Sequence, residues 1–269
     1  MRYFFHIGYS GTNYSGWQRH PYGLGVQQVL ETSIKQVLKV PVNLVGCGRT
    51  DAGVHASQFF FHLDLEQEWA YDLLFRLNKV LPPDIAIFDI IPMEGLPHAR
   101  FDATHRSYDY FIHTYKDPFL NDSSTLYLEP NLHLDKMKEA TALLLKYTDY
   151  RAFCKTPAQH DNTICHITEA GWFADAQGGK LRFHISANRF VRRMIRLVVG
   201  KLLKVGSGTL SVAEFESYLA TLQPPDAFSV AHPQGLYLSK VTYPYLDLPA
   251  KAGFATAFQS QGCSYWQAV

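Results

Sequence analysis

The sequence is poor in cysteine, in net charge and in long apolar runs. Its four cysteines are widely scattered and form no CxxC pair, so a structural zinc site is not expected and a reducing compartment suits them. Basic and acidic residues nearly cancel at a formal net charge of +1, so any RNA-binding site must come from a local cluster of cations. The most apolar helical stretch, residues 191–203, contains four arginine or lysine residues, which excludes a membrane-spanning helix there.

The composition of the 269-residue chain is that of a globular protein, with 47% hydrophobic and 18% charged residues. This length allows one large domain or two of ordinary size. The N-terminal apolar run is too short for a signal peptide and has no small-residue cleavage site, so we expect a cytoplasmic location. Twelve histidines are present without an HExxH or comparable ligand pattern, and we therefore predict that no metal is bound.

Hydrophobic periodicity predicts an α+β protein with two similar halves. In the first half, the pattern predicts strands at 2–9 and 85–91, two strands that flank a loop near residue 51, and helices at 26–38 and 71–80. A β-α-β-β-α-β order of this kind fits a ferredoxin-like α/β sandwich.

The second half is predicted to run through similar elements. Strands are expected at 106–113, 163–174, 180–187 and 236–243, and helices at 134–145, 189–204 and 213–221. We therefore predict an N-terminal domain at 1–100, a C-terminal domain at 101–246 with a cleft between the two, and a tail at 247–269. The sequence assigns no role to this tail.

A nine-residue string lies between two β-prone segments: Gly48-Arg49-Thr50-Asp51-Ala52-Gly53-Val54-His55-Ala56. Glycine and aspartate between such segments are typical of a strand–loop–strand unit. Gly48 and Gly53 let the backbone bend sharply and let a large ligand approach closely. By composition alone, an aspartate in a loop is most often a turn former or a cap. The function of Asp51 therefore depends on further information.

Arginines gather in the segment predicted as the helix 189–204. At about 100° per residue, apolar residues fall on one side and five cations without an acid fall on the other. These cations are Arg189, Arg192, Arg193, Arg196 and Lys204. A charged face is often simply a solvated face, but here no acid at i,i+4 relieves the repulsion. A phosphate-bearing partner would relieve it, which favours nucleic-acid binding.

Six strings in the chain resemble the motifs of the TruA family of tRNA pseudouridine synthases. They occur in the family's order over residues 2–243, about nine tenths of the chain. The string around Asp51 is the most specific of them. The others are 9–18 (where Ser10 stands in place of the usual Asp), 97–101, 106–110, 190–196 and 235–238.

The resemblance implies the pseudouridine synthase fold, in which two ferredoxin-like halves form a mixed or antiparallel sheet with a central cleft. It also implies roles for particular residues. Asp51 would be the catalytic residue, held ionised by Arg196, and Tyr108 would stack on the target base and help to move a proton. Leu236 would line the base pocket, and Arg49 would fill the gap left by the flipped base or clamp a phosphate. The remaining substrate-binding candidates are Arg189, Arg192 and Arg193.

The activity that the resemblance implies is the conversion of uridine to pseudouridine at positions 38, 39 and 40 in the anticodon arm of tRNA. No cofactor or metal is expected for this reaction. Asp51 would either attack the sugar or remove the C2′ proton, and the sequence leaves both possibilities open. The family works as a homodimer with one tRNA crossing both subunits, so a homodimer is expected here, without a membrane partner.

Two other classes of function stay open from the sequence. One is an RNA-binding protein without catalysis, against which the joint presence of Asp51, Tyr108 and Arg196 argues. The other is a glycosidase-like hydrolase with Asp51 as the nucleophile, which needs a second carboxyl group as the acid. The candidates for that acid are Asp102, Asp109 and Glu169.

Overall fold

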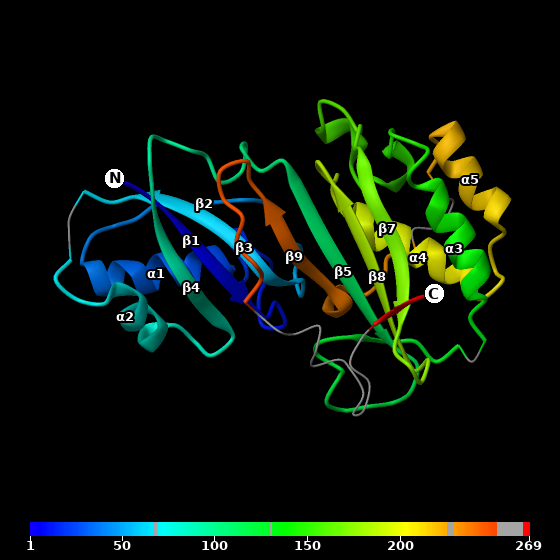
Figure 1. Cartoon of the computed structure of the whole chain (residues 1–269), viewed down its shortest axis with the longest axis horizontal. Helices are drawn as coiled ribbons and strands as arrows, with labels where there is room; N and C mark the ends of the chain where they lie inside the picture. Colours follow the sequence, from blue (N-terminus) through cyan, green and yellow to red (C-terminus); the bar gives the residue numbers. More distant parts are fainter. Residues whose placement is uncertain (67–68, 130, 225–228, 252–265) are drawn as a thin grey trace. The chain divides into compact units, whose positions relative to one another are not determined.

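The computed structural model describes the chain except for residues 67–68, 130, 225–228 and 252–265 (Figure 1). The described residues form two compact units. The first unit contains Met1–Arg106 and the segment that begins at Tyr237, and the second contains Ser107–Leu236 and the C-terminal residues 266–269. The prediction that residues 1–100 and 101–246 form two domains stays a prediction. Most of the predicted tail lies outside the described residues.

The first unit combines a small sheet with two helices. Its elements are β1 (Arg2–Tyr9), α1 (Val26–Leu38), β2 (Val45–Gly46), β3 (His55–Asp64), α2 (Leu73–Val80), β4 (Ile85–Met93) and β9 (Leu236–Thr242). The strand order β4-β1-β3-β2 has antiparallel neighbours throughout, and β9 pairs in parallel with the start of β3. This order with α1 and α2 is the split β-α-β arrangement that the sequence pattern predicts.

Strands β1 and β3 are buried on both faces, and aromatic side chains lie on both of these faces because successive residues of a strand point to opposite sides. On one face, the rings of Phe5 and Phe61 stack with centroids 4.7 Å apart. On the other face, Phe4 and Phe60 each meet the ring of Tyr243 at 5.5 Å. Burying one such side chain stabilises a fold by about 1.5–3 kcal/mol. Since Tyr243 follows β9, the segment after β9 covers the second face of the sheet.

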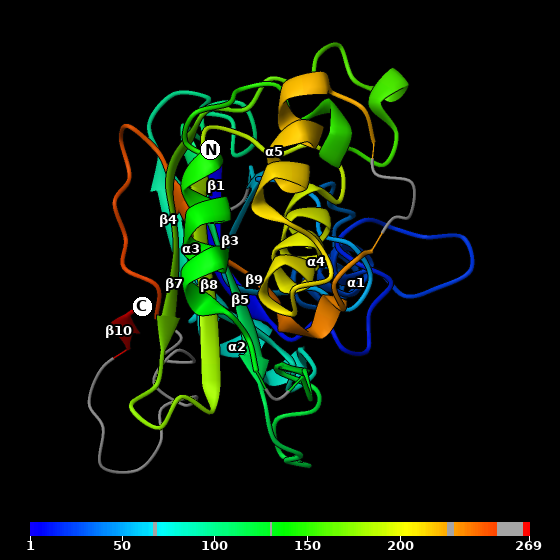
Figure 2. The same cartoon turned by 90° about the vertical axis from the view of Figure 1, so that its right-hand side faces the viewer.

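The second unit repeats the order strand, helix, strand, strand, helix. Its strands are β5 (His105–His113), β6 (Thr125–Leu126), β7 (Ile167–Ala174), β8 (Lys180–Ala187) and β10 (Gln267–Ala268). Its helices are α3 (Leu134–Leu143), α4 (Met194–Gly206) and α5 (Val212–Thr221), with short 3-10 turns at Arg151–Phe153, Pro157–Gln159 and Pro233–Gly235. The strand order is β10-β7-β8-β5. Helices α3, α4 and α5 lie together beside these strands (Figure 2), and Trp172 of β7 donates a hydrogen bond to Thr141 of α3 at 3.0 Å.

The helix that carries Arg196 begins later than predicted. The sequence pattern predicts a helix at 189–204, whereas α4 begins at Met194. The preceding residue, Arg193, has a φ of 62°, a left-handed conformation that interrupts a right-handed helix. The prediction that five cations share one helical face is therefore wrong, because only Arg196 and Lys204 of the five lie on α4.

The fold class is confirmed as α+β, with five α-helices and ten strands in the part of the chain that the structure describes. Apart from α4, the main predicted helices and strands agree with the observed ones to within a few residues at each end. No helix among the described residues is both long enough and apolar enough to cross a membrane. The predicted central cleft stays a prediction.

Candidate active-site residues

The loop that contains Asp51 connects β2 to β3 and is held by backbone hydrogen bonds. The N–H of Trp17 donates to the carbonyl of Thr50 at 3.2 Å, and the N–H of Gly53 donates to the carbonyl of Tyr14 at 3.2 Å. Both partners belong to the segment that follows β1. The loop backbone is therefore fixed from outside as well as by its own turn.

Two glycines let the segment after β1 lie directly against this loop. A Cβ atom at Gly11 would stand 2.1 Å from the carbonyl oxygen of Val54, which is closer than any side chain can approach. Gly16 has a φ of 95°, and its Cβ would stand 2.4 Å from the carbonyl oxygen of Thr50. Only glycine permits this close contact and this conformation together.

His55 connects the loop to two other parts of the first unit. Its Nδ1 accepts a hydrogen bond from the N–H of Gly11 at 3.0 Å, so a neutral ring carries its proton on Nε2. The hydroxyl of Ser10, the residue that departs from the family pattern, lies 3.3 Å from the same nitrogen. The imidazole also stacks on the ring of Tyr237 in β9, with centroids 4.4 Å apart. These contacts fix the strand that leaves the loop.

Arg106 holds the other end of the loop. Its Nη2 donates to the carbonyl of Cys47 at 2.9 Å and to the carbonyl of Arg100 at 2.8 Å. Its Nη1 donates to the carbonyl of Ala103 at 3.3 Å. A guanidinium suits this task because its donors form a rigid planar fork. Since Cys47 directly precedes Gly48, Arg106 fixes the backbone where the loop begins.

Arg49 and Asp51 differ in exposure although only one residue separates them. The Arg49 side chain is exposed, and Asp51 is half-buried. The loop thus presents one cation to solvent and one partly shielded carboxylate.

In the second unit, Tyr108 lies half-buried on β5 and meets Phe190 edge to face. Their ring centroids are 5.3 Å apart with an interplanar angle of 86°. Tyr110, two residues along the strand, is fully buried and donates a hydrogen bond to the carbonyl of His232 at 2.8 Å. Burial raises the pKa of Tyr110 to about 12. Of the two tyrosines, only Tyr108 keeps part of its side chain exposed to solvent.

Arg196 lies in the first turn of α4. It is hydrogen-bonded to the segment 229–231, called the strap here, which packs against this helix. Its Nε donates to the carbonyl of Ala231 at 2.7 Å, and the N–H of Ala231 donates to the carbonyl of Arg196 at 3.0 Å. The strap lies so close to α4 that a Cβ atom at Gly200 would stand 2.1 Å from the carbonyl oxygen of Ser229. The bond from Nε fixes the direction of the guanidinium, and the backbone bond holds Ala231 against α4.

Leu236 directly precedes the point where the chain passes from the second unit to the first. Its side chain is buried, at 6% exposure. The preceding Gly235 packs closely against β5, since its Cβ would stand 2.7 Å from the carbonyl oxygen of Phe111. This close contact leaves no freedom for the backbone that carries Leu236.

The three arginines before α4 occupy irregular backbone. Arg189 is half-buried, and its Nη1 donates to Oδ1 of Asn162 at 3.4 Å. Arg192 is exposed, and its carbonyl accepts a hydrogen bond from the N–H of Lys155 at 3.2 Å. Arg193 is half-buried and caps α4. The cations thus belong to a cap and a loop rather than to one helical face.

The predicted site residues therefore fall into two groups. The first unit holds Arg49 and Asp51, and the second holds Tyr108, Leu236 and the arginines of the segment 189–196. The predicted pairing of Asp51 with Arg196 joins residues of different units and stays a prediction. Among the described residues, no three or more His, Cys, Asp or Glu side chains are arranged to hold a metal ion.

Sequence reasoning assigned no role to His55 or Arg106. Both lie within strings that resemble family motifs, and this was the only signal in the sequence that could have singled them out. Their contacts join segments far apart in the chain, which a local pattern does not reveal.

Comparisons with known proteins agree on one family. A family model described as tRNA pseudouridine synthase matches residues 142–244. Similar proteins named tRNA pseudouridine synthase A occur in Porphyromonas gingivalis, with 42% identity over 90% of this chain and 97% of the relative, and in Parabacteroides distasonis, with 41% identity over 90% and 96%. A protein of the same name from Hydrogenobaculum sp. is 35% identical over 90% of this chain and 99% of its own length.

Proposed function

Since the chain belongs to the tRNA pseudouridine synthase family and is an isomerase that acts on tRNA, we propose that Asp51 is its catalytic residue and that its targets are uridines 38, 39 and 40 of the anticodon arm. The observation that carries this assignment is the loop around Asp51. Its backbone is fixed at both ends, and it presents a partly shielded carboxylate together with the exposed Arg49.

The reaction rearranges bonds within one nucleotide. The C1′–N1 bond of uridine breaks and a C1′–C5 bond forms, while C5 loses a hydrogen and N1 gains one. The target base has to leave its stack before a side chain can reach it. Ionised Asp51 then assists the cleavage, either by attacking the sugar or by taking the C2′ proton. Both routes need a charged carboxylate at neutral pH.

Arg196 is the proposed partner that keeps Asp51 ionised. A guanidinium beside a carboxylate favours its charged form and offsets the cost of partial burial. The hydrogen bond from Nε to the Ala231 carbonyl fixes the plane of the guanidinium. The proposal pairs this guanidinium with the Asp51 carboxylate.

Tyr108 and Leu236 are the proposed walls of the base pocket. Aromatic stacking on one side and an apolar contact on the other suit a flat, unstacked uracil. The edge of Phe190 holds the Tyr108 ring in orientation, and the Tyr108 hydroxyl would help to move a proton. Arg49 would fill the gap left by the flipped base or clamp a phosphate.

The remaining substrate contacts are assigned to the three arginines before α4. Arg192 is exposed and Arg189 and Arg193 are half-buried, so Arg192 is the best placed of the three to contact a phosphate at the surface. A net charge of +1 gives a single chain little cationic surface. We therefore propose a homodimer, in which two chains share one tRNA in the cytoplasm, and sedimentation at micromolar concentration tests this assembly.

A glycosidase-like reaction is disfavoured by the state of two of its three candidate acids, Asp102 and Asp109. Asp102 accepts hydrogen bonds from the His98 N–H at 2.8 Å and from the Tyr245 hydroxyl at 3.0 Å. The bond from the His98 N–H holds the pKa of Asp102 below its usual range, whereas a general acid needs the opposite shift. Asp109 accepts a hydrogen bond from Nε of Arg182 at 2.9 Å, which also favours the charged form.

The first experiment measures tritium release from C5-labelled uridine in an unmodified tRNA transcript. Wild type should release tritium, since forming the carbon–carbon bond expels that hydrogen. Asp51→Ala and Asp51→Asn should release at least about 1,000-fold less, because removing a covalent or acid–base group costs that order of rate.

The matched control is Asp135→Asn, which removes a fully exposed carboxylate on α3 and should leave the release rate unchanged. Binding of the same transcript by the Asp51 variants should persist. Near-normal release by Asp51→Asn would refute the assignment.

A further inference from the structure

The first unit carries an aromatic pair beside the Asp51 loop to which the reaction assigns no role. It lies in the turn after β4, which four hydrogen bonds close. The His98 N–H donates to Asp102 Oδ2 at 2.8 Å, and the Asp102 N–H donates to the His98 carbonyl at 3.1 Å. Nδ1 of His98 accepts from the N–H groups of Arg100 and Phe101 at 3.1 and 3.2 Å. The turn is therefore a preformed structure.

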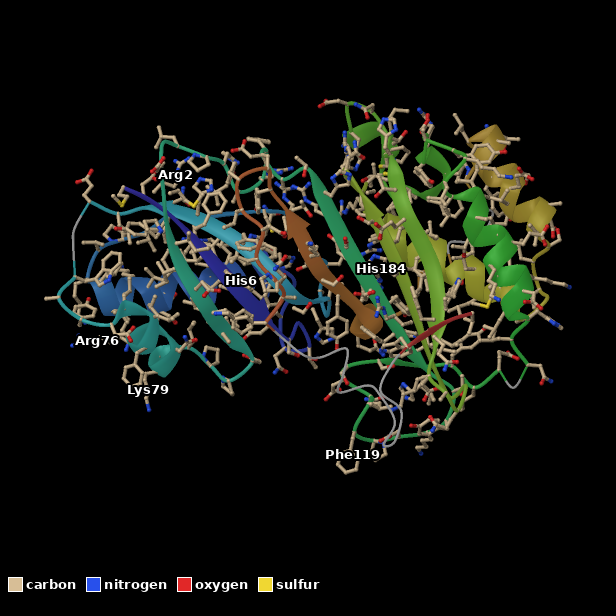
Figure 3. All side chains as sticks on the ribbon, viewed as in Figure 1. Arg2, His6, Arg76, Lys79, Phe119 and His184 are labelled. Atoms are coloured by element: carbon tan, nitrogen blue, oxygen red, sulfur yellow. The ribbon has the colours of Figure 1, made fainter. Side chains whose placement is uncertain are left out.

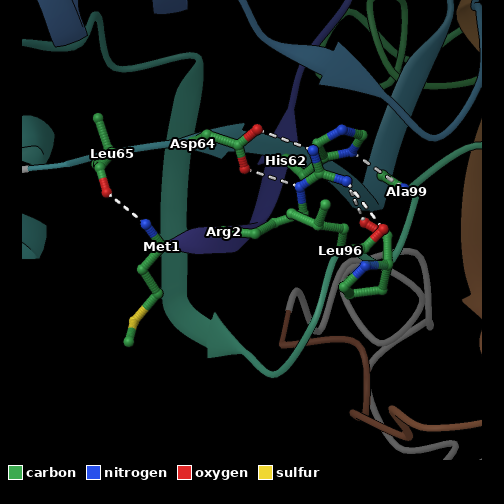
Figure 4. A network of polar contacts seen from close by, with 8 residues as sticks. Met1, Arg2, His62, Asp64, Leu65, Leu96 and Ala99 are labelled. Carbon is green, nitrogen blue, oxygen red and sulfur yellow. Dashed lines mark hydrogen bonds and ion pairs between the residues drawn. The ribbon is translucent and has the colours of Figure 1, made fainter.

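The Phe101 ring is held in place and yet open to solvent. It stacks on the His98 imidazole with centroids 4.2 Å apart and an interplanar angle of 29°, and it is 75% exposed. His98 is supported in turn by the ring of His62 at 4.8 Å. Nδ1 of His62 accepts a hydrogen bond from the Ala99 N–H at 3.1 Å, inside the polar network drawn in Figure 4. Single exposed aromatics are common, but one backed by a stacked ring on a closed turn is preorganised for a flat ligand.

Arg106 places this turn next to the Asp51 loop. A single nitrogen, Nη2, donates both to the Arg100 carbonyl at 2.8 Å and to the Cys47 carbonyl at 2.9 Å. The carbonyls of Arg100, next to Phe101, and of Cys47, next to Gly48, therefore bind the same nitrogen. Both segments belong to the first unit.

The charge beside the ring has the sign that a nucleic acid requires. Arg100 is exposed, and its Cζ lies 5.8 Å from the Phe101 centroid. Arg49 in the neighbouring loop is exposed as well. Asp102, the acid of this turn, accepts hydrogen bonds from His98 and Tyr245, so its charge is partly compensated.

We propose that Phe101, backed by His98, is a stacking platform for an unpaired base of the RNA substrate, with Arg100 contacting the adjacent phosphate. The proposal rests on the proposed function, because it adds a second contact to the same substrate. Proteins that bind unpaired nucleotides combine an aromatic face for the base with a cation for the backbone. Such a platform holds the RNA near the loop while the target uridine leaves its stack.

The test compares Phe101→Ala, Phe101→Trp and a matched control, Phe75→Ala. Phe75 is also an exposed phenylalanine of the first unit, at 59% exposure, and a cation, Lys79 Nζ, lies 5.5 Å from its ring. Figure 3 shows Arg76 and Lys79 projecting outward from the same helix, α2. The control thus repeats the exposure and the neighbouring charge at another place.

Phe101→Ala should raise the Kd and KM for an unmodified tRNA transcript about 10-fold, the effect expected from losing one base stack, and leave kcat within about 2-fold. Phe101→Trp should bind as tightly as wild type or more tightly, and Phe75→Ala should match wild type. A transcript with 2-aminopurine in the anticodon loop should lose fluorescence on wild type but not on Phe101→Ala. Arg100→Gln should lower the salt dependence of binding by about one phosphate contact.

An unchanged Kd for folded Phe101→Ala would overturn the proposal. So would a variant that sediments as a smaller species with unchanged affinity per protomer, since the ring would then be a contact between copies of the chain. Of the three quantities Kd, KM and kcat, only the Kd is independent of turnover. A wild type that releases no tritium would therefore overturn the proposed function without deciding the fate of the platform.

Discussion

The two segments that hold the charged site residues, the Asp51 loop and the segment 189–196, are built in different ways. The loop is held by contacts that only glycine permits: Gly11 and Gly16 allow the neighbouring backbone to touch it. The segment 189–196 is held by hydrogen bonds that need no glycine within it: from Lys155 to the Arg192 carbonyl, from Arg189 to Asn162, and between Arg196 and Ala231. It turns into α4 at one left-handed residue, Arg193. One site segment is thus coupled to its neighbours by backbone contacts that only glycine allows, and the other turns into a helix at one left-handed residue.

This difference implies different responses to mutation. In the first segment, backbone sterics couple the loop to the segment after β1, so one added methyl group should disturb both. In the second segment, a substitution at Arg193 should change only the backbone strain at that residue. Substitutions at Gly16 and at Arg193 therefore distinguish the two kinds of support.

The largest effect is expected from Gly16→Ala in the first unit. The added Cβ would stand 2.4 Å from the Thr50 carbonyl oxygen in a conformation with φ at 95°. We expect a loss of about 2–4 kcal/mol in the free energy of unfolding, measured in urea, together with loss of tritium release. Gly208→Ala is the control, because Gly208 also has a positive φ, 74°, but open space around it. It should cost only about 1–2 kcal/mol, and equal losses in the two variants would contradict the close-contact account.

A smaller effect is expected from Arg106→Lys, which acts on the loop without adding atoms to it. Lysine cannot reach the Cys47, Arg100 and Ala103 carbonyls together, so the start of the loop should shift. Small misplacements of a catalytic group are costly, and we expect kcat for tRNA to fall about 10- to 100-fold with Kd within about 3-fold.

The control for Arg106→Lys is Arg2→Lys in the same unit. Arg2 donates to the carbonyls of Leu96 and Pro97, each at 3.0 Å, and pairs with Asp64 (Figure 4). Arg2 thus holds residues 96–97, whereas Arg106 holds residues 100–103 of the same segment and the start of the Asp51 loop. Its loss should lower Tm and leave kcat unchanged. If both variants lose Tm and keep kcat, Arg106 is a structural residue without a positioning role.

The sequence alone predicted most of the fold because its signals are local. Helix α1 has the predicted bounds, since Val26, Leu30 and Ile34 repeat at helical spacing and are fully buried. The strand–loop–strand unit around Asp51 was likewise predicted from its glycines. The start of α4 was not, because the apolar periodicity continues into residues that precede the helix, and nothing local marks the left-handed Arg193.

The support around the Asp51 loop was beyond sequence reasoning for a different reason. The bond from Arg106 to Cys47 joins residues 59 positions apart, and the stack of His55 on Tyr237 joins two strands distant in the chain. The residue types of Arg106 and His55 do not indicate which residues they contact. The roles of Asp51, Tyr108 and Arg196 were inferred by resemblance, and they stay predictions that kinetics must test.

The smallest expected effect is the difference in stability between glycine and alanine at position 193. Its sign depends on whether Arg193 has a left-handed conformation or belongs to the helix. At the left-handed Arg193, alanine costs about 1–2 kcal/mol of strain that glycine avoids, so Arg193→Gly should be more stable to urea than Arg193→Ala. Within a helix the order reverses by about 1 kcal/mol. The control pair is Lys204→Gly and Lys204→Ala inside α4, where alanine should be the more stable. The same order at both positions would mean that the helix begins before Arg193 in solution, and the shared cationic face predicted from the sequence would then regain its support.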